Sequence, residues 1–340
     1  MIKKVRERLD GNSFLLMITI LLFIALYIAG VLIFSDKNFG KPQVFFNLFI
    51  NNASLIVAAV GMTMVLITGG IDISIGSVIG MSCMMLAWMM EKQGMNPIVS
   101  IVIVLIVGGV FGLVQGFFVA YLKIQPFIVT LAGMFFARGM TAVISSDMIS
   151  ITNETFLKMA NSKIYLPFLA IVNKKGNLVY PYIYPSVVIA VVILIVAFIV
   201  LRYTAFGRSI YAVGGNEQSA LLMGLNVRRT KLKVYVLNGF LAGLAGFVFC
   251  LNSCGGFVEQ ARGFEMEAIA SSVIGGTLLT GGVGSVVGSL FGVLIKGTIE
   301  SLITFQGTLS SWWTKIVIAA LLCFFIILQS IFAKLKDKKK

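Results

Sequence analysis

The sequence predicts an all-α protein that crosses a membrane about ten times, with both ends in the cytoplasm. Of its 340 residues, 59% are hydrophobic and 12% are charged, whereas a soluble domain carries about 25% charged residues. The apolar residues form runs of roughly 20, the length that a helix needs to cross about 30 Å of hydrocarbon. Only helices or a closed barrel can satisfy the backbone inside a membrane. The runs lack the alternation of a barrel strand, so helices are expected.

Ten segments are expected to cross the membrane, and the third and eighth are the shortest. They cover residues 14–34, 45–67, 75–90, 97–120, 127–146, 184–202, 232–252, 265–280, 284–304 and 313–332. The first segment has a basic start but is too long for the apolar core of a signal peptide, so we expect an uncleaved span. We treat residues 1–340 as a single transmembrane domain.

Basic residues gather on one side of the predicted membrane. They precede the first span (Lys3, Lys4, Arg6, Arg8), flank a central loop (Arg202, Arg208, Arg228, Arg229, Lys231, Lys233) and follow the last span (Lys334, Lys336, Lys338, Lys339, Lys340). An excess of Lys and Arg is typical of cytoplasmic loops, so both termini and the central loop are expected in the cytoplasm. The net charge of +14 follows this topology and is therefore not taken as a sign of nucleic-acid binding.

Two long loops separate the spans. The loop over about 145–185 lies outside the cell by the order of the spans, and its apolar patch at 165–172 forms either a short helix on the membrane surface or part of a capping loop, which we prefer. The cytoplasmic loop over about 203–232 contains a turn signal at Gly214 and Gly215.

A short helix is expected within the cytoplasmic loop. Asn216 is a good N-cap residue and Glu217 suits the first turn, so residues 218–223 are expected to be helical. Gly224 supplies the stop. The helix is either a plain connector or a docking element for a partner, and its clear start and stop favour docking.

One glycine-rich motif occurs twice. Residues 68–71 (TGGI) lead to 76–80 (GSVIG), and residues 280–283 (TGGV) lead directly to 284–288 (GSVVG). Paired short segments interrupted by glycine indicate a transport site with broken helices, although glycines also let helices pack closely.

Charged and polar residues inside spans are the candidates for function. Asp72 either lines the solute pathway or caps the third span together with Ser74. Arg138 is expected to meet a carboxylate, and Lys296 and Glu300 are expected to form a structural ion pair because they lie four residues apart.

Amide and hydroxyl side chains suit an uncharged, hydroxyl-rich solute, although they also join helices. The candidates for the translocation pathway are Asn51, Asn52, Thr68, Asp72, Ser74, Gln115 and Thr280.

The sequence offers little for catalysis. It lacks the phosphate-binding pattern G-x-x-x-x-G-K-[ST], so ATP is not expected to bind this chain. It has no histidine, and its four cysteines form no disulfide framework. We therefore expect no catalytic residues, no metal and no bound cofactor. Few Asp and Glu lie in the spans, which disfavours proton-coupled transport.

Three ordered motifs resemble the ribose-type sugar permeases of ABC importers. They are residues 68–77 (TGGIDISIGS), 207–217 (GRSIYAVGGNE), and 268–270 (AIA) with 273–277 (VIGGT) and 281–284 (GGVG). The likeness runs from about 45 to 330. Within the family, residues 126–136 (PFIVTLAGMFF) and 307–316 (GTLSSWWTKI) are most similar to permeases of galactofuranose importers.

The resemblance implies a permease subunit in a bacterial cytoplasmic membrane that imports a monosaccharide resembling galactofuranose, ribose or another pentose or hexose. Its implied partners are an ATPase with tandem nucleotide-binding modules that uses ATP and Mg²⁺, an extracytoplasmic sugar-binding protein, a second permease copy or a related permease, and membrane lipid. The ATPase-coupling residues implied are Gly214, Gly215, Asn216, Glu217, Ala220 and Gly224. A stand-alone secondary carrier or facilitator for small polar solutes is the alternative.

Overall fold

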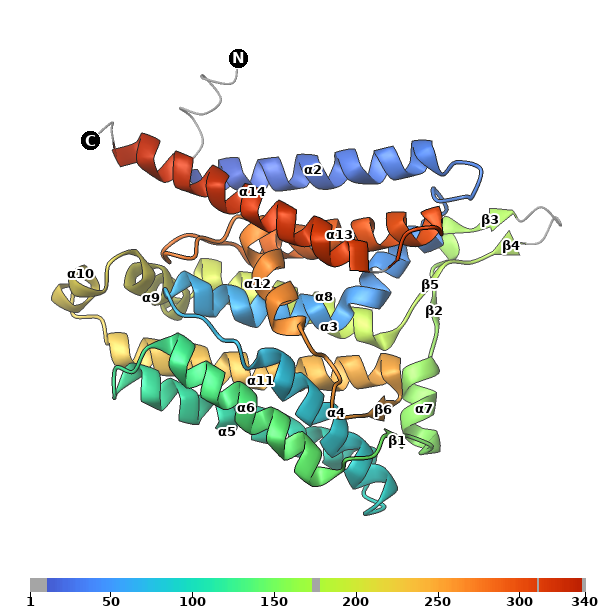
Figure 1. The fold of residues 1–340 in the computed structure, drawn as a ribbon, viewed down its shortest axis with the longest axis horizontal. Coiled ribbons are helices and arrows are strands. Elements are labelled where there is room, and N and C mark those ends of the chain that lie inside the picture. The colour runs from blue at the N-terminus through green and yellow to red at the C-terminus, as the bar shows by residue number, and fades with distance from the viewer. Residues whose placement is uncertain (1–10, 173–177, 311, 338–340) are drawn as a thin grey trace.

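The computed structural model describes residues 11–172, 178–310 and 312–337 and is mostly helical (Figure 1). The long helices are α2 (Gly11–Ile33), α3 (Pro42–Ile67), α4 (Ile75–Glu91), α5 (Pro97–Ala120), α6 (Pro126–Ile144), α8 (Pro185–Tyr203), α11 (Val227–Ser253), α13 (Val286–Gln306) and α14 (Trp312–Asp337). The short helices are α7 (Glu154–Asn161), η1 (Pro167–Leu169), α9 (Ala205–Gly215), α10 (Glu217–Leu222) and α12 (Phe264–Ile274). Three two-residue antiparallel ribbons pair β1 (Ile149–Ser150) with β6 (Gly255–Gly256), β2 (Ile164–Tyr165) with β5 (Tyr182–Ile183), and β3 (Ile171–Val172) with β4 (Leu178–Val179).

Proline fixes the start of several long helices. α3, α5, α6 and α8 begin at Pro42, Pro97, Pro126 and Pro185. Proline suits the first helical position, where its missing N–H would have no helical partner. The predicted spans therefore agree with these helices to within a few residues at their starts.

The helices run side by side, with α9 and α10 at one end of the bundle and α7 with the short ribbons at the other (Figure 1). α3 lies in the centre, where its second half is almost wholly buried. It packs against α11, α13, α12 and α8. α11 also lies against α5, with Gly239 of α11 in backbone contact with Gly108 and Gly112 of α5.

Large apolar side chains cover the outer faces of the bundle. Ile106 of α5, Phe135 of α6 and Val192 of α8 are 60%, 66% and 51% exposed. Within the described residues, seven helices are long and apolar enough to cross a membrane. An outer surface of this kind needs lipid around it, and the chain is therefore a polytopic membrane protein.

The eighth predicted span is wrong at its end. Residues 265–280 were expected to cross, but α12 stops at Ile274, where Gly275 and Gly276 leave the helix. Its 11 residues measure about 16 Å at 1.5 Å per residue, half of the hydrocarbon thickness. α12 therefore does not cross a membrane alone, and the count of ten crossings stays a prediction.

The loop at 145–185 contains one α-helix, a single 3-10 turn and short ribbon strands among its described residues. The patch at 165–172 contains the end of β2, η1 and β3, so the surface helix considered for it is wrong. The helix in this loop is instead α7, which buries Phe156. Glu91 at the end of α4 accepts hydrogen bonds from the backbone N–H of Thr152 at 2.8 Å and of Asn153 at 3.0 Å. The loop is thereby attached to the bundle.

The loop at 203–232 contains a helix, α9, that was not expected from the sequence. α9 begins after Thr204, whose hydroxyl accepts a hydrogen bond from the N–H of Gly207 at 3.1 Å. Gly214 and Gly215, expected to form a turn, are the last residues of this helix. The predicted helix at 218–223 is α10, one residue earlier.

Candidate functional site

α10 is a short helix with an N-cap of its own and two contacts to the neighbouring helices. The Oδ1 of Asn216 accepts a hydrogen bond from the N–H of Ser219 at 2.8 Å, as an N-cap does. Glu217 and Lys231 form an ion pair at 2.6 Å. Ala220 is fully buried and packs with Val213 and Val227. Of the positions predicted for coupling, Asn216, Glu217 and Ala220 belong to α10 or its cap, Gly224 follows it, and Gly214 and Gly215 end α9.

The tip of α10 is apolar and open. Leu221, Leu222 and Met223 are 55%, 90% and 67% exposed, and Gly224 ends the element with a φ of +78°. Three consecutive exposed apolar residues beyond the long helices make this tip a candidate contact surface.

The two glycine motifs meet at the C-terminal end of α9. The N–H of Gly282 donates to the carbonyl of Ile67 at 2.8 Å. A Cβ on Gly214 would overlap that carbonyl, so only glycine lets α9 approach so closely. Gly281 lies against the backbone of Gly69. The predicted repeat therefore forms a single junction that joins α3, α9 and the segment before α13.

Two pathway candidates lie at this junction. Thr68 caps α3 and donates its hydroxyl to the carbonyl of Val65 at 2.7 Å. Thr280 is exposed, and its carbonyl would lie 3.8 Å from a Cβ on Gly69.

Three other candidates form a buried cluster. The Oδ1 of Asp72 accepts hydrogen bonds from the N–H of Ser74 at 2.8 Å and from its hydroxyl at 2.6 Å. Asn238 donates to the Oδ2 of Asp72 at 2.6 Å, and Gln115 donates to the hydroxyl of Ser74 at 2.9 Å. Asp72, Ser74 and Gln115 are 2%, 1% and 4% exposed. Here they join the 68–74 segment to α5 and α11, and their part in a pathway stays a prediction.

Lys296 binds more partners than the predicted pair. Its Nζ lies 2.9 Å from the Oε2 of Glu300, 3.3 Å from the Oε2 of Glu267 and 3.3 Å from the Oδ1 of Asn52. The sequence analysis missed Glu267, which lies on α12. Of the remaining candidates, Asn52 therefore belongs to this cluster, whereas the neighbouring Asn51 is exposed.

A cavity of about 170 Å³ opens beside this cluster. Its lining consists of Glu267, Lys296, Glu300, Trp312, Thr314 and Lys315. It lies where α12, α13 and α14 come together.

Arg138 finds a different partner from the one expected. Its Nη1 donates to the carbonyls of Val258 at 2.8 Å and Gln260 at 2.7 Å. Backbone carbonyls, and not the predicted carboxylate, accept these hydrogen bonds, and Arg138 thereby holds the 257–263 segment that leads to α12.

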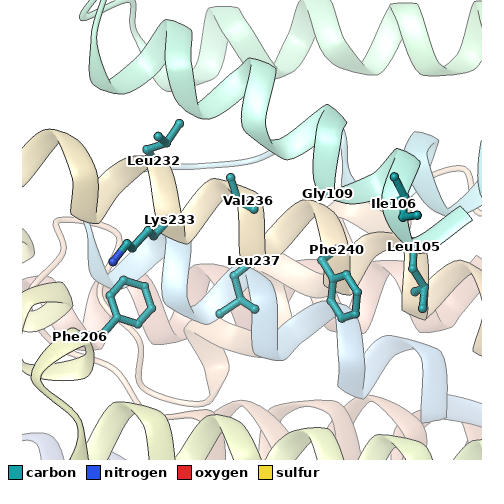
Figure 2. Close-up of a pocket in the computed structure, with 9 residues that line it drawn as sticks. All are labelled: Leu105, Ile106, Gly109, Phe206, Leu232, Lys233, Val236, Leu237 and Phe240. Atoms are coloured by element: carbon teal, nitrogen blue, oxygen red, sulfur yellow. The ribbon is translucent and has the colours of Figure 1, made fainter. Parts of the chain in front are cut away.

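A larger groove of about 480 Å³ lies between α5, α9 and α11 (Figure 2). Its lining is Leu105, Ile106, Gly109, Phe206, Leu232, Lys233, Val236, Leu237 and Phe240. Apart from Lys233, which lies near Phe206 (Figure 2), these side chains are apolar or absent. Such a lining cannot satisfy the hydroxyl groups of a polar solute.

Residues 44–326 match a family model described as the permease component of the branched-chain amino acid transport system. The inner membrane ABC transporter permease protein YjfF of Escherichia coli strain K12 is 42% identical over 92% of this chain and 91% of its own length. The fructose import permease protein FruG of Bifidobacterium longum is 34% identical over 98% of this chain and 95% of its own. The ribose import permease protein RbsC of E. coli is 32% identical over 87% of this chain and 88% of its own. No solved structure matches the chain.

Proposed function

Because the chain belongs to the family of permease components of the branched-chain amino acid transport system, and within it to the ribose-type sugar permeases of ABC importers, we propose that it moves a monosaccharide inward and takes its driving force from a partner ATPase. It is a multi-pass protein of the cytoplasmic membrane. The three motifs predicted to resemble this family lie within the matched residues.

The exposed apolar tip of α10 carries the proposal. Leu222 is 90% exposed while Ala220 beside it is fully buried, so α10 combines a fixed base with a free apolar end. We assign the tip to a groove on the ATPase. ATP and Mg²⁺ bind to the partner ATPase. The permease then changes between two states because the ATPase contacts α10 differently in each state. The same arrangement needs an extracytoplasmic sugar-binding protein and a second permease, either another copy or a related chain.

Leu222→Asp tests the docking assignment. Leu222 contributes little to folding because it is so exposed, and the new carboxylate opposes insertion into an apolar groove. The variant should reach the membrane, lose sugar uptake and fail to co-purify with the ATPase in mild detergent. Leu309→Asp is the matched control, since it introduces the same charge on a 41% exposed leucine in the segment between α13 and α14. Normal uptake and co-purification of Leu222→Asp would refute the assignment.

The proposed substrate is galactofuranose or a similar pentose or hexose. The likeness at 126–136 and 307–316 supports galactofuranose, and the relatives named for fructose and ribose import support the wider class. Uptake of a labelled sugar is measured in the presence of unlabelled galactofuranose, ribose or fructose. The degree of inhibition ranks the three sugars as substrates. A rank order that places ribose or fructose above galactofuranose would contradict the narrower assignment.

The proposed topology has ten crossings within one domain, with both ends, α9 and α10 in the cytoplasm. In this topology the short helices α4 and α12 each span part of the membrane, and the non-helical chain next to each helix spans the rest. Of the flanking basic residues, Lys3, Lys4, Arg6 and Arg8 and also Lys338, Lys339 and Lys340 lie outside the described residues. Purified chain alone in liposomes should transport no sugar, whereas transport without the ATPase would favour the stand-alone carrier.

A further inference from the structure

Charged side chains gather around Lys296, near the middle of a helix long and apolar enough to cross a membrane. α13 has 21 residues, and Lys296 lies near its middle, about 15 Å from the helix start at 1.5 Å per residue. The side chains of Glu267 and Glu300 are 27% and 49% exposed. Carboxylates at this depth do not face hydrocarbon, because the cost is several kcal/mol each. The open side of the cluster therefore faces water or a polar solute.

The charges around the cavity balance. Glu267 and Glu300 supply two carboxylates, and Lys296 and Lys315 supply two ammonium groups. Such a lining favours an uncharged ligand, which leaves the balance unchanged. Carboxylates accept hydrogen bonds and ammonium groups donate them, so together they suit hydroxyl groups, which do both.

Trp312 gives the cavity an apolar wall. Its side chain is 67% exposed, and the Nζ of Lys315 lies 4.6 Å from the ring centroid, which holds the indole in place. A flat ring of this kind can contact the C–H face of a sugar while the carboxylates contact its hydroxyls. The volume of about 170 Å³ is below that of drug-sized pockets, about 300–1,000 Å³, and has room for one sugar ring.

The Asp72 cluster and the groove beside Phe240 each lack one of these features. The Asp72 cluster has polar groups but is buried and internally hydrogen-bonded. The groove beside Phe240 has room but is apolar. We therefore propose that the cavity bounded by Glu267, Lys296, Glu300 and Trp312 is a low-affinity binding site for a single uncharged sugar ring. This proposal rests on the proposed function.

The test measures sugar uptake against sugar concentration in vesicles that contain the complete importer. Trp312→Ala and Glu300→Gln should each raise the half-saturating concentration about tenfold, equal to about 1.4 kcal/mol. Trp313→Ala is the matched control, since Trp313 is the next residue, is 46% exposed and does not line the cavity. It should leave the half-saturating concentration unchanged. Co-purification with the ATPase should be normal in all three variants.

A second measurement uses the purified chain in detergent. Millimolar galactofuranose or ribose should quench tryptophan fluorescence in the wild type and in Trp313→Phe, but not in Trp312→Phe. If the wild type transports sugar and the Trp312 and Trp313 variants give the same result in both assays, the sugar-binding site is refuted while the proposed function stands. If the wild-type importer transports no sugar, the proposed function itself fails, whatever the variants do.

Discussion

Two adjacent glycines at the end of α9 should respond to alanine with opposite signs. A Cβ on Gly214 would overlap the carbonyl of Ile67 and lie 2.6 Å from the backbone nitrogen of Gly282. A Cβ on Gly215 would meet nothing within 4 Å. Both residues belong to the same helix, so the pair isolates the effect of the junction from the effect of helix propensity.

The expected magnitudes follow from these contacts. Alanine is favoured over glycine in a helix by about 0.5–1 kcal/mol, and Gly215→Ala should gain up to this amount. Gly214→Ala gains the same term but overpacks the junction, which costs about 1–3 kcal/mol. It also pushes apart the hydrogen bond between Ile67 and Gly282, worth about 1 kcal/mol. The net loss for Gly214→Ala is therefore about 1–3 kcal/mol.

Thermal unfolding of the purified chain in detergent checks the pair. At about 2 °C per kcal/mol for a large chain, Gly214→Ala should lower Tm by about 2–6 °C, whereas Gly215→Ala should keep it or raise it slightly. Sugar uptake should fall in the first variant and persist in the second. Equal shifts of the same sign would show that the close contact at Gly214 does not hold α9 in place.

The other predictions concern single polar contacts. Glu217→Lys replaces the ion pair with Lys231 by a repulsion, and the loss of stability should be no more than about 1 kcal/mol because the pair is partly exposed. Sugar uptake should fall and proteolytic cleavage at α10 should become faster. An unchanged cleavage rate would argue against Glu217 as an anchor of α10. Arg138→Met removes two charge-assisted hydrogen bonds to backbone carbonyls and should cost about 3 kcal/mol, measured as a lower midpoint in thermal unfolding; a midpoint equal to that of the wild type would contradict it. Asn238→Asp places two carboxylates together at the buried Asp72 and should destabilise by about 3 kcal/mol or more, whereas Asn238→Ser, which keeps a donor, should cost less; equal losses would show that charge is not the cause.

Much of the helical framework could be predicted because its signals are local. Apolar length and an initial proline determine where α5 and α8 begin. The end of α12 could not be predicted, because apolar residues continue past Ile274 while two glycines end the helix. α9 was missed because its final glycines are also typical of a turn, although Thr204 offered an N-cap signal.

The candidate sites depended on contacts between distant segments. Lys296 and Glu300 lie four residues apart, and their pairing could be predicted. Glu267 lies on a different helix, and no periodicity connects it to Lys296. The apolar run at 221–223 is indistinguishable in sequence from core residues, and only its exposure in the structure makes it a candidate contact surface.

The ribbon between β1 and β6 connects the rim of the molecule with its interior. Ser150 pairs with Gly255, and the chain continues from there to α12, which carries Glu267. β1 lies in the 145–185 loop, so the ribbon fastens this loop to the segment that leads to α12. Arg138 of α6 holds the same segment through the carbonyls of Val258 and Gln260. The segment that leads to Glu267 is therefore attached at two places, to the 145–185 loop and to α6.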